Sequence, residues 1–211
     1  MLDYKNKKIS ISIINLKLNN IYSIYNALTE CGYKVKIIED NVKKISSDIM
    51  IIPGVGSFPK AMDYLKKNSL DKIIEEFNFS KKPIIGICLG MQLLFEKSNE
   101  FSNCKGLSLL NGEVLKIKNK NLRVPNIGWS KIKLLKKSKV IKDNSNNNFF
   151  YFVHSYHCKP KNFSNILSLT NLNKFKFCSS VQKNNLLGMQ FHPEKSGLEG
   201  LKIINNFKNL I

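Results

Sequence analysis

Apolar residues in the first half of the chain form short strand-like runs, separated by segments with helical spacing. Residues 8–15 (KISISIIN) alternate polar and apolar positions, whereas residues 48–52 (DIMII) and 83–87 (PIIGI) contain the continuous apolar runs of buried strands. The predicted strands are residues 8–15, 34–38, 48–52 and 83–87, and the predicted helices are residues 21–31, 60–67, 70–77 and 89–97. This order predicts a mostly parallel central sheet with helices on both faces.

From residue 113 onward, strand-like runs follow one another with turn residues between them. The predicted strands are residues 112–118, 129–135, 149–158, 166–170, 175–182 and 186–191. They predict antiparallel strands added to the edge or end of the parallel sheet, followed by a last helix over residues 198–209. The polar run 143–148 (DNSNNN) is predicted to be a surface loop, because the strands beside it are too short to form separate cores.

The size and composition of the chain favour one α/β domain over residues 1–211. A chain of 211 residues, 43% of them hydrophobic, can bury one sizeable core. Its net charge of +19 raises the question of a nucleic-acid partner, but Arg123 is the single arginine and the lysines are scattered. Because phosphate and base recognition relies on the arginine fork, we expect neither a nucleic-acid nor a membrane partner.

The cysteines indicate a reduced compartment rather than a disulfide framework. Five cysteines occur without a CxxC pair or any second cluster with metal-ligand spacing, so we expect no metal and no cofactor. The first residues resemble no signal peptide, and no apolar stretch reaches membrane-spanning length. These features predict a soluble, cytoplasmic protein.

The segment 86–90 (GICLG) places Cys88 between two glycines where a buried strand meets a helix. This is the sequence form of a nucleophile elbow, in which the glycines allow strand and helix to approach closely. The helix N-terminus would favour the thiolate, and the Leu89 N–H could donate to an oxyanion. The same pattern also fits a small buried cysteine at the end of a strand.

His192 is the strongest candidate for a general base among the three histidines. It lies just past a predicted strand in the segment 188–194 (GMQFHPE). In an extended segment, residues two apart point the same way, so Glu194 could orient the imidazole. Cys88, His192 and Glu194 together predict a catalytic triad at the carboxyl ends of parallel strands. His157 is expected to be an ordinary strand residue, and His154 to be structural or to face a substrate.

The motifs GICLGMQLLF and QFHPEKS resemble those of the class I glutamine amidotransferases. The additional segments PGVGSF at 53–58, YFVHSY at 151–156 and the Gly128-Trp129 pair resemble the glutaminase subunits of imidazole glycerol phosphate synthase. These segments span most of the chain in the family's order. The resemblance implies a glutaminase that passes ammonia to a synthase or cyclase subunit, expected to be a (βα)8 barrel, in a heterodimer.

The resemblance also implies roles for individual residues. The Val55 N–H would complete an oxyanion hole with Leu89, and the glycines beside Val55 would make the required peptide flip cheap. The residues implied to bind glutamine are Gly54, Gln92, Glu100, Ser155 and Tyr156. A carboxylate at Glu100 suits an α-ammonium group, and backbone N–H groups suit an α-carboxylate.

Two segments depart from the family pattern, and both face the synthase subunit in the family. Asn126 stands in PNIGW where the family usually has histidine, and Leu18-Asn19-Asn20 lacks the usual glycine. A paralogous glutaminase that supplies ammonia to a surface-sugar amidotransferase is therefore the alternative function. A glutaminase of pyridoxal phosphate synthesis is disfavoured by PGVGSF, and a catalytically silent binding module by the intact triad.

Overall fold

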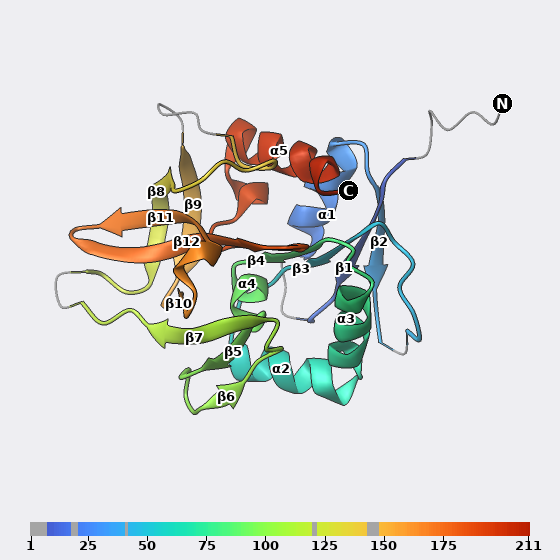
Figure 1. Cartoon of the computed structure of the whole chain (residues 1–211), viewed down its shortest axis with the longest axis horizontal. Helices are drawn as coiled ribbons and strands as arrows, with labels where there is room; N and C mark the ends of the chain where they lie inside the picture. The colour runs from blue at the N-terminus through green and yellow to red at the C-terminus, as the bar shows by residue number, and fades with distance from the viewer. Residues whose placement is uncertain (1–7, 18–20, 41, 120–121, 143–147) are drawn as a thin grey trace.

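The computed structural model describes residues 8–17, 21–40, 42–119, 122–142 and 148–211 (Figure 1). The Leu18-Asn19-Asn20 segment lies outside these residues, as do positions 143–147 of the predicted surface loop. The described residues form one mixed sheet with helices against it (Figure 1). None of their helices has both the length and the apolar character needed to cross a bilayer.

Five neighbouring strands form the parallel part of the sheet, in the order β2-β1-β3-β4-β13. Their bounds are β1 (Ser10–Ile14), β2 (Lys34–Ile38), β3 (Ile49–Ile52), β4 (Ile84–Ile87) and β13 (Leu186–Met189). The first four strands confirm the sequence prediction. β13 was predicted within the antiparallel group, and this was wrong in part, because it pairs antiparallel with β12 but parallel with β4.

Helices cover both faces of these strands, as predicted. α1 (Ile21–Glu30) and α5 (Gly197–Asn205) lie on one face, and α2 (Phe58–Lys67), α3 (Leu70–Phe79) and α4 (Leu89–Leu93) lie on the other (Figure 1). Successive strand residues serve the two faces in turn: Met50 and Ile52 belong to one hydrophobic core, and Ile49 and Ile51 to the other. The fully apolar strands of the sequence thus fill two cores at once.

Further strands extend the sheet beyond β13, and most of them pair antiparallel, as predicted. β5 is an exception, because it was predicted as part of a helix and pairs parallel with β7. β12 and β10 follow β13, then β7, β5 and β6, while β11, β8 and β9 branch from β12. Their bounds are β5 (Phe95–Ser98), β6 (Cys104–Lys105), β7 (Leu110–Lys116), β8 (Asn126–Leu134), β9 (Phe149–His154), β10 (Tyr156–Pro160), β11 (Ile166–Leu172) and β12 (Phe175–Lys183).

The predicted helix over residues 89–97 was wrong in its second half. α4 ends at Leu93, and β5 begins at Phe95. The Phe95 carbonyl accepts the Ser108 N–H, and the Glu96 carbonyl accepts the Gly106 N–H. Pairing with a later segment therefore overrides the local helix preference.

The run 149–158, predicted as one strand, is broken at Ser155. β9 pairs with β8, whereas β10 pairs with β7 and β12. The chain thus passes from one branch of the sheet to the other beside the end of β4. The last helix also stops earlier than predicted: α5 ends at Asn205 and continues as a 3-10 turn over Asn206–Leu210.

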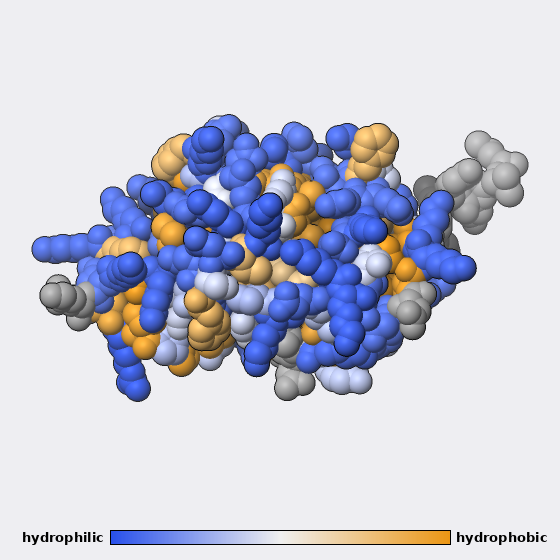
Figure 2. All heavy atoms as spheres, turned by 90° about the horizontal axis from the view of Figure 1, so that it is seen from below, coloured by the Kyte–Doolittle hydropathy of each residue, from blue (hydrophilic) through white to orange (hydrophobic). Residues whose placement is uncertain are grey.

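Figure 2 shows hydrophilic residues spread over the whole of one face, with small apolar areas between them. The large apolar side chains that are most exposed around β8 and β9 are Ile127, Trp129 and Phe149.

Candidate active site

Cys88 lies in a tight turn between β4 and α4, with φ 53° and ψ −107°. A side chain rarely tolerates positive φ, and such strain concentrates at functional sites. The turn depends on its glycines: a Cβ at Gly86 would lie 2.6 Å from the Gly90 carbonyl oxygen, and a Cβ at Gly90 would lie 1.7 Å from the Ile52 carbonyl oxygen. The backbone therefore has the geometry expected of a nucleophile elbow.

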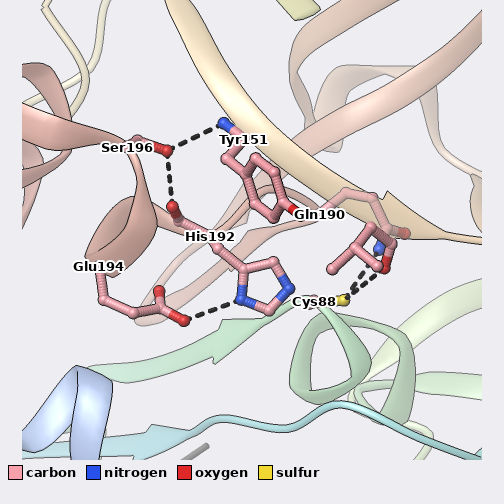
Figure 3. Close-up of polar contacts among 7 residues, drawn as sticks. Cys88, Tyr151, Gln190, His192, Glu194 and Ser196 are labelled. Carbon is pink, nitrogen blue, oxygen red and sulfur yellow. Dashed lines mark hydrogen bonds and ion pairs between the residues drawn. The ribbon is translucent and has the colours of Figure 1, made fainter. Parts of the chain in front are cut away.

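Pairing between β4 and β13 brings the second motif to Cys88. Gly188 lies opposite Gly86 in the parallel register, and the Cys88 N–H donates to the Met189 carbonyl at 2.7 Å. Parallel neighbours end at the same edge of a sheet. The residues that follow β13, Gln190 and His192, consequently lie beside the Cys88 sulfur (Figure 3).

His192 stands between Cys88 and Glu194. Its Nδ1 lies 2.8 Å from Glu194 Oε1, and both side chains are at most 2% exposed. Its Nε2 points toward the Cys88 sulfur (Figure 3) and hydrogen-bonds to none of the described nitrogen or oxygen atoms. We predicted an extended segment from His192 to Glu194; the structure instead has a 3-10 turn over Pro193–Lys195 that follows an extended His192.

The surroundings of His192 favour its protonated form. Burial lowers the pKa of His192, but Cys88 and the Glu194 carboxylate more than offset this effect and raise the pKa to about 10. An imidazole placed between a sulfur and a carboxylate can hold a proton and pass it on from Nε2.

Ser196 fixes the backbone of His192, a role that the sequence analysis did not assign. Its hydroxyl donates to the His192 carbonyl at 2.6 Å and accepts the Tyr151 N–H at 3.0 Å (Figure 3). The His192 N–H in turn donates to the Tyr151 carbonyl at 2.9 Å. Two of these hydrogen bonds thus tie the turn that carries His192 to β9, and the third holds the turn together.

Gln190 was also missed, although it lies in the QFHPE motif. It is fully buried, and its amide nitrogen lies 3.6 Å from the Cys88 sulfur. Its amide oxygen accepts from Gln92 Nε2 at 3.1 Å. A glutamine two residues before the candidate base was the available signal, since residues two apart in an extended segment point the same way.

The loop opposite Cys88 fills the predicted oxyanion site with its own carbonyl. The Leu89 N–H donates to the Gly54 carbonyl at 3.3 Å. In a trans peptide the carbonyl and the following N–H point in opposite directions, so the Val55 N–H points away from the Leu89 N–H. Gly54 and Gly56 have φ of 155° and 118°, which leaves this peptide between two glycines at positive φ.

A cavity of about 440 Å³ opens beside the Cys88 sulfur. Six of the residues implied to form the oxyanion hole or to bind glutamine line it: Val55, Leu89, Gln92, Glu100, Ser155 and Tyr156. Gly54 is not among the lining residues. The cavity also contacts three residues that were not predicted to bind substrate: Phe101, Lys116 and Pro125. His154, expected to be structural or to face a substrate, lines it as well.

Glu100 presents a carboxyl group to this cavity. It is only 9% exposed, and its Oε2 accepts the Phe58 N–H at 2.7 Å. Burial raises the pKa of Glu100, while the Phe58 hydrogen bond lowers it. An ammonium group bound in the cavity would give the Glu100 carboxylate a partner of opposite charge.

Among the described residues, no group of three or more His, Cys, Asp or Glu side chains could hold a metal ion. The described cysteines are all free thiols. The groups brought together beside the cavity are a thiol, an imidazole and a carboxylate.

Comparison with known proteins gives one consistent family. The family model described as "Glutamine amidotransferase class-I" matches residues 12–210. The HisH protein of imidazole glycerol phosphate synthase from Bacillus thuringiensis (strain Al Hakam) is 40% identical over 201 residues, which cover 95% of each chain. The HisH protein from Wolinella succinogenes is 37% identical over 201 residues, covering 93% of this chain and 98% of that protein.

Solved structures agree on the fold at lower identity. PurLQS from Thermotoga maritima aligns with a TM-score of 0.75 at 18% identity, covering 96% of this chain and 99% of that one. A glutamine amidotransferase from the same organism aligns with a TM-score of 0.67 at 15% identity, covering 97% of this chain and 84% of that one. With the family model matching nearly the whole length, this chain belongs to the class I glutamine amidotransferases.

Proposed function

We propose that this chain is the glutaminase subunit of an imidazole glycerol phosphate synthase, with residues 1–211 as one glutamine amidotransferase domain. It hydrolyses glutamine to glutamate and ammonia, and the ammonia passes to a cyclase subunit in histidine biosynthesis. The observation that carries the pathway is the 40% identity to HisH over 95% of both chains. The buried contact between His192 and Glu194 beside Cys88 carries the chemistry.

Cys88, His192 and Glu194 would perform acyl transfer. The Cys88 sulfur attacks the side-chain amide carbon of glutamine, and the C–N bond breaks as His192 Nε2 delivers a proton to the leaving ammonia. The resulting glutamyl thioester is hydrolysed by a water whose proton His192 takes up, releasing glutamate and free thiol. Glu194 holds the imidazole in the required orientation through its 2.8 Å hydrogen bond.

The cavity would hold glutamine by its two charged ends. Glu100 would bind the α-ammonium group, and the backbone at Ser155 and Tyr156 would bind the α-carboxylate. Gln92 would support this backbone, because its Nε2 donates to the Tyr156 carbonyl at 3.1 Å. Gly54 would contribute only after its peptide turns.

Turning that peptide would switch the glutaminase on. With the Gly54 carbonyl against Leu89, neither predicted donor is free for an oxyanion. Loss of one such donor costs on the order of 10² to 10³ in rate. The free chain is therefore expected to be nearly inactive, and a partner that favours the flipped peptide would raise the rate by population shift.

The partner would be a (βα)8-barrel cyclase in a heterodimer, docked on the branch formed by β8 and β9. Three apolar side chains on this branch are 46% to 61% exposed: Ile127, Trp129 and Phe149. Aromatic and aliphatic anchors of this kind commonly form the centre of a protein interface.

The test combines the chain with an imidazole glycerol phosphate cyclase. Glutaminase rates are measured for the free chain and for the complex, and cyclase product is measured with glutamine or with ammonium salts. We expect stimulation of about 10² to 10³ on docking. Cys88→Ala should abolish the glutamine-dependent synthesis and preserve the ammonium-dependent synthesis, with Cys104→Ala as a matched control.

Three outcomes would contradict parts of this proposal. A free chain as fast as the complex would remove the gating. Loss of both activities in Cys88→Ala would remove the assignment of separate sites. Stimulation by a sugar amidotransferase and not by the cyclase would replace the pathway and leave the triad in place.

A further inference from the structure

The ring of His154 is held between two groups that define its tautomer. Its Nδ1 lies 2.8 Å from the Tyr156 carbonyl oxygen, and its Nε2 lies 3.0 Å from Asn126 Nδ2. A carbonyl oxygen can only accept, so Nδ1 carries the proton and Nε2 accepts from the Asn126 amide. The side chain is 6% exposed, which leaves water little part in this arrangement.

The Tyr156 carbonyl is the meeting point of two donors. Besides His154 Nδ1, it accepts from Gln92 Nε2 at 3.1 Å. Gln92 Nε2 also donates to Gln190 Oε1 at 3.1 Å, which turns the Gln190 amide nitrogen toward the Cys88 sulfur at 3.6 Å. An N–H group is thus directed at the candidate nucleophile.

These contacts form one continuous chain from the first residue of β8 to the nucleophile. Asn126 and His154 are directly paired across β8 and β9. The side-chain amides of Gln92 and Gln190 each have one possible orientation. The Tyr156 carbonyl requires the NH2 end of Gln92, and that NH2 group in turn requires the oxygen of Gln190. A change at Asn126 is thus passed along the chain to Cys88.

We propose that Asn126 and His154 are positioning residues for the glutaminase reaction. They hold the Tyr156 carbonyl, and through Gln92 and Gln190 they keep an N–H group directed at the Cys88 sulfur. This role rests on the proposed glutaminase function. It means that Asn126, at the start of β8, influences the reactivity of Cys88. Neither residue touches the reacting atoms.

The decisive variant is Asn126→Asp, which has nearly the same shape but offers only acceptor oxygens. Nε2 of His154 would then face a carboxylate and take up a proton, so His154 would no longer be the neutral Nδ1–H form. Nitrogen-15 NMR of the free chain at neutral pH should show this form in the unmodified protein and its loss in Asn126→Asp. Asn111→Asp adds the same charge at an exposed position of β7 and should leave the His154 signals unchanged.

The second readout is the rate at which iodoacetamide alkylates Cys88, located by mass spectrometry. A charged His154 would bind the Tyr156 carbonyl more strongly and weaken the competing hydrogen bond from Gln92 Nε2. Alkylation should therefore slow about tenfold in Asn126→Asp, and Asn111→Asp should stay within about twofold of the unmodified chain. If Asn126→Asp does not fold, Asn126→Leu removes the donor without adding a charge and is expected to slow alkylation in the same direction. With the cyclase present, KM for glutamine should rise along with the fall in kcat, because the Tyr156 backbone also shifts.

An Nε2–H tautomer of His154 in the unmodified chain would overturn the proposal. So would unchanged alkylation in a folded variant whose His154 signal has moved. Both measurements use the free chain and an alkylating reagent, so they stay readable if the chain fails to hydrolyse glutamine with the cyclase. That failure would instead remove the proposed function.

Discussion

The His192 ring hydrogen-bonds to the Glu194 carboxylate on one side and faces the Cys88 sulfur on the other. Proton transfer by the ring and orientation of the ring can therefore be tested separately. In the proposed mechanism the ring itself moves the proton, whereas Glu194 orients the ring and stabilises its charge. Glu194→Gln keeps a hydrogen-bonding side chain of the same length. We therefore expect the Glu194→Gln variant to keep a kcat at least about tenfold higher than that of His192→Ala. The measurement is glutamate release in the complex. Equal losses in the two variants would show that Glu194 takes a larger part in the chemistry.

The Ser196 hydroxyl has a second measurable effect at the scale of a single residue. Ser196→Ala leaves the buried Tyr151 N–H and His192 carbonyl without their shared partner. We expect the free energy of unfolding to fall by about 1–3 kcal/mol in urea titrations, with a smaller loss of kcat. Ser102→Ala, on an exposed serine, is the matched control and should change stability by less than about 0.5 kcal/mol. A stability loss no larger than that of the control would remove this role.

At the scale of elements, the approach of α4 to β3 decides whether the Cys88 turn can form. A Cβ at Gly90 would lie 1.7 Å from the Ile52 carbonyl oxygen, which is backbone and cannot rotate away. Gly90→Ala should therefore destabilise the protein by several times more than Gly32→Ala. A Cβ at Gly32 meets nothing within 4 Å, and only its φ of 84° opposes the change, at about 1 kcal/mol. Thermal unfolding of the two variants checks this, and equal shifts would contradict it.

The elements that sequence pattern predicted well are those whose local pattern agrees with the fold. β3 and β4 are continuous apolar runs, and α2 and α3 keep helical spacing. β5 and the break at Ser155 depend on which other strands each backbone pairs with. A local pattern does not contain that information, since Phe95–Ser98 fits a helix or a strand equally well.

The candidate site divides in the same way. Cys88, His192 and Glu194 stand in short motifs whose residue types and spacing indicate a catalytic site, so they could be identified as candidates from the sequence alone. Ser196 and Gln190 lie in those same motifs, but their roles come from contacts with Tyr151, Gln92 and Cys88 across the fold. Only the assembled sheet shows which of the polar residues near the triad hold it in place.

For the whole molecule, two buried histidines give stability opposite dependences on pH. Burial lowers the pKa of His154 to about 4, against 6.5 for an ordinary histidine. Between pH 6.5 and pH 4 the unfolded chain binds the extra proton and the folded chain does not, so stability falls as pH falls, by about 3 kcal/mol in all. His192, with its pKa raised to about 10, loses its contribution as pH rises from 6.5 toward 10.

Stability should accordingly be greatest near pH 6.5 and decline on both sides. The measurement is the free energy of unfolding in urea at pH 4.5, 5.5, 6.5, 8 and 9.5. His154→Gln should flatten mainly the acid side and His192→Gln mainly the alkaline side. An acid slope that persists in His154→Gln would show that other groups produce it.

The pairing of β4 with β13 has a consequence for how the enzyme comes into being. Residue 88 leaves the ribosome long before residue 192, and until β13 is made, β4 presents an unpaired edge of apolar residues. A nascent chain in this state carries the risk of wrong pairing that unprotected edges bring. It also carries a cysteine with no base beside it. Under the proposed function, synthesis of the final segment would both close the edge and bring His192 beside Cys88, so a half-made chain would release no ammonia.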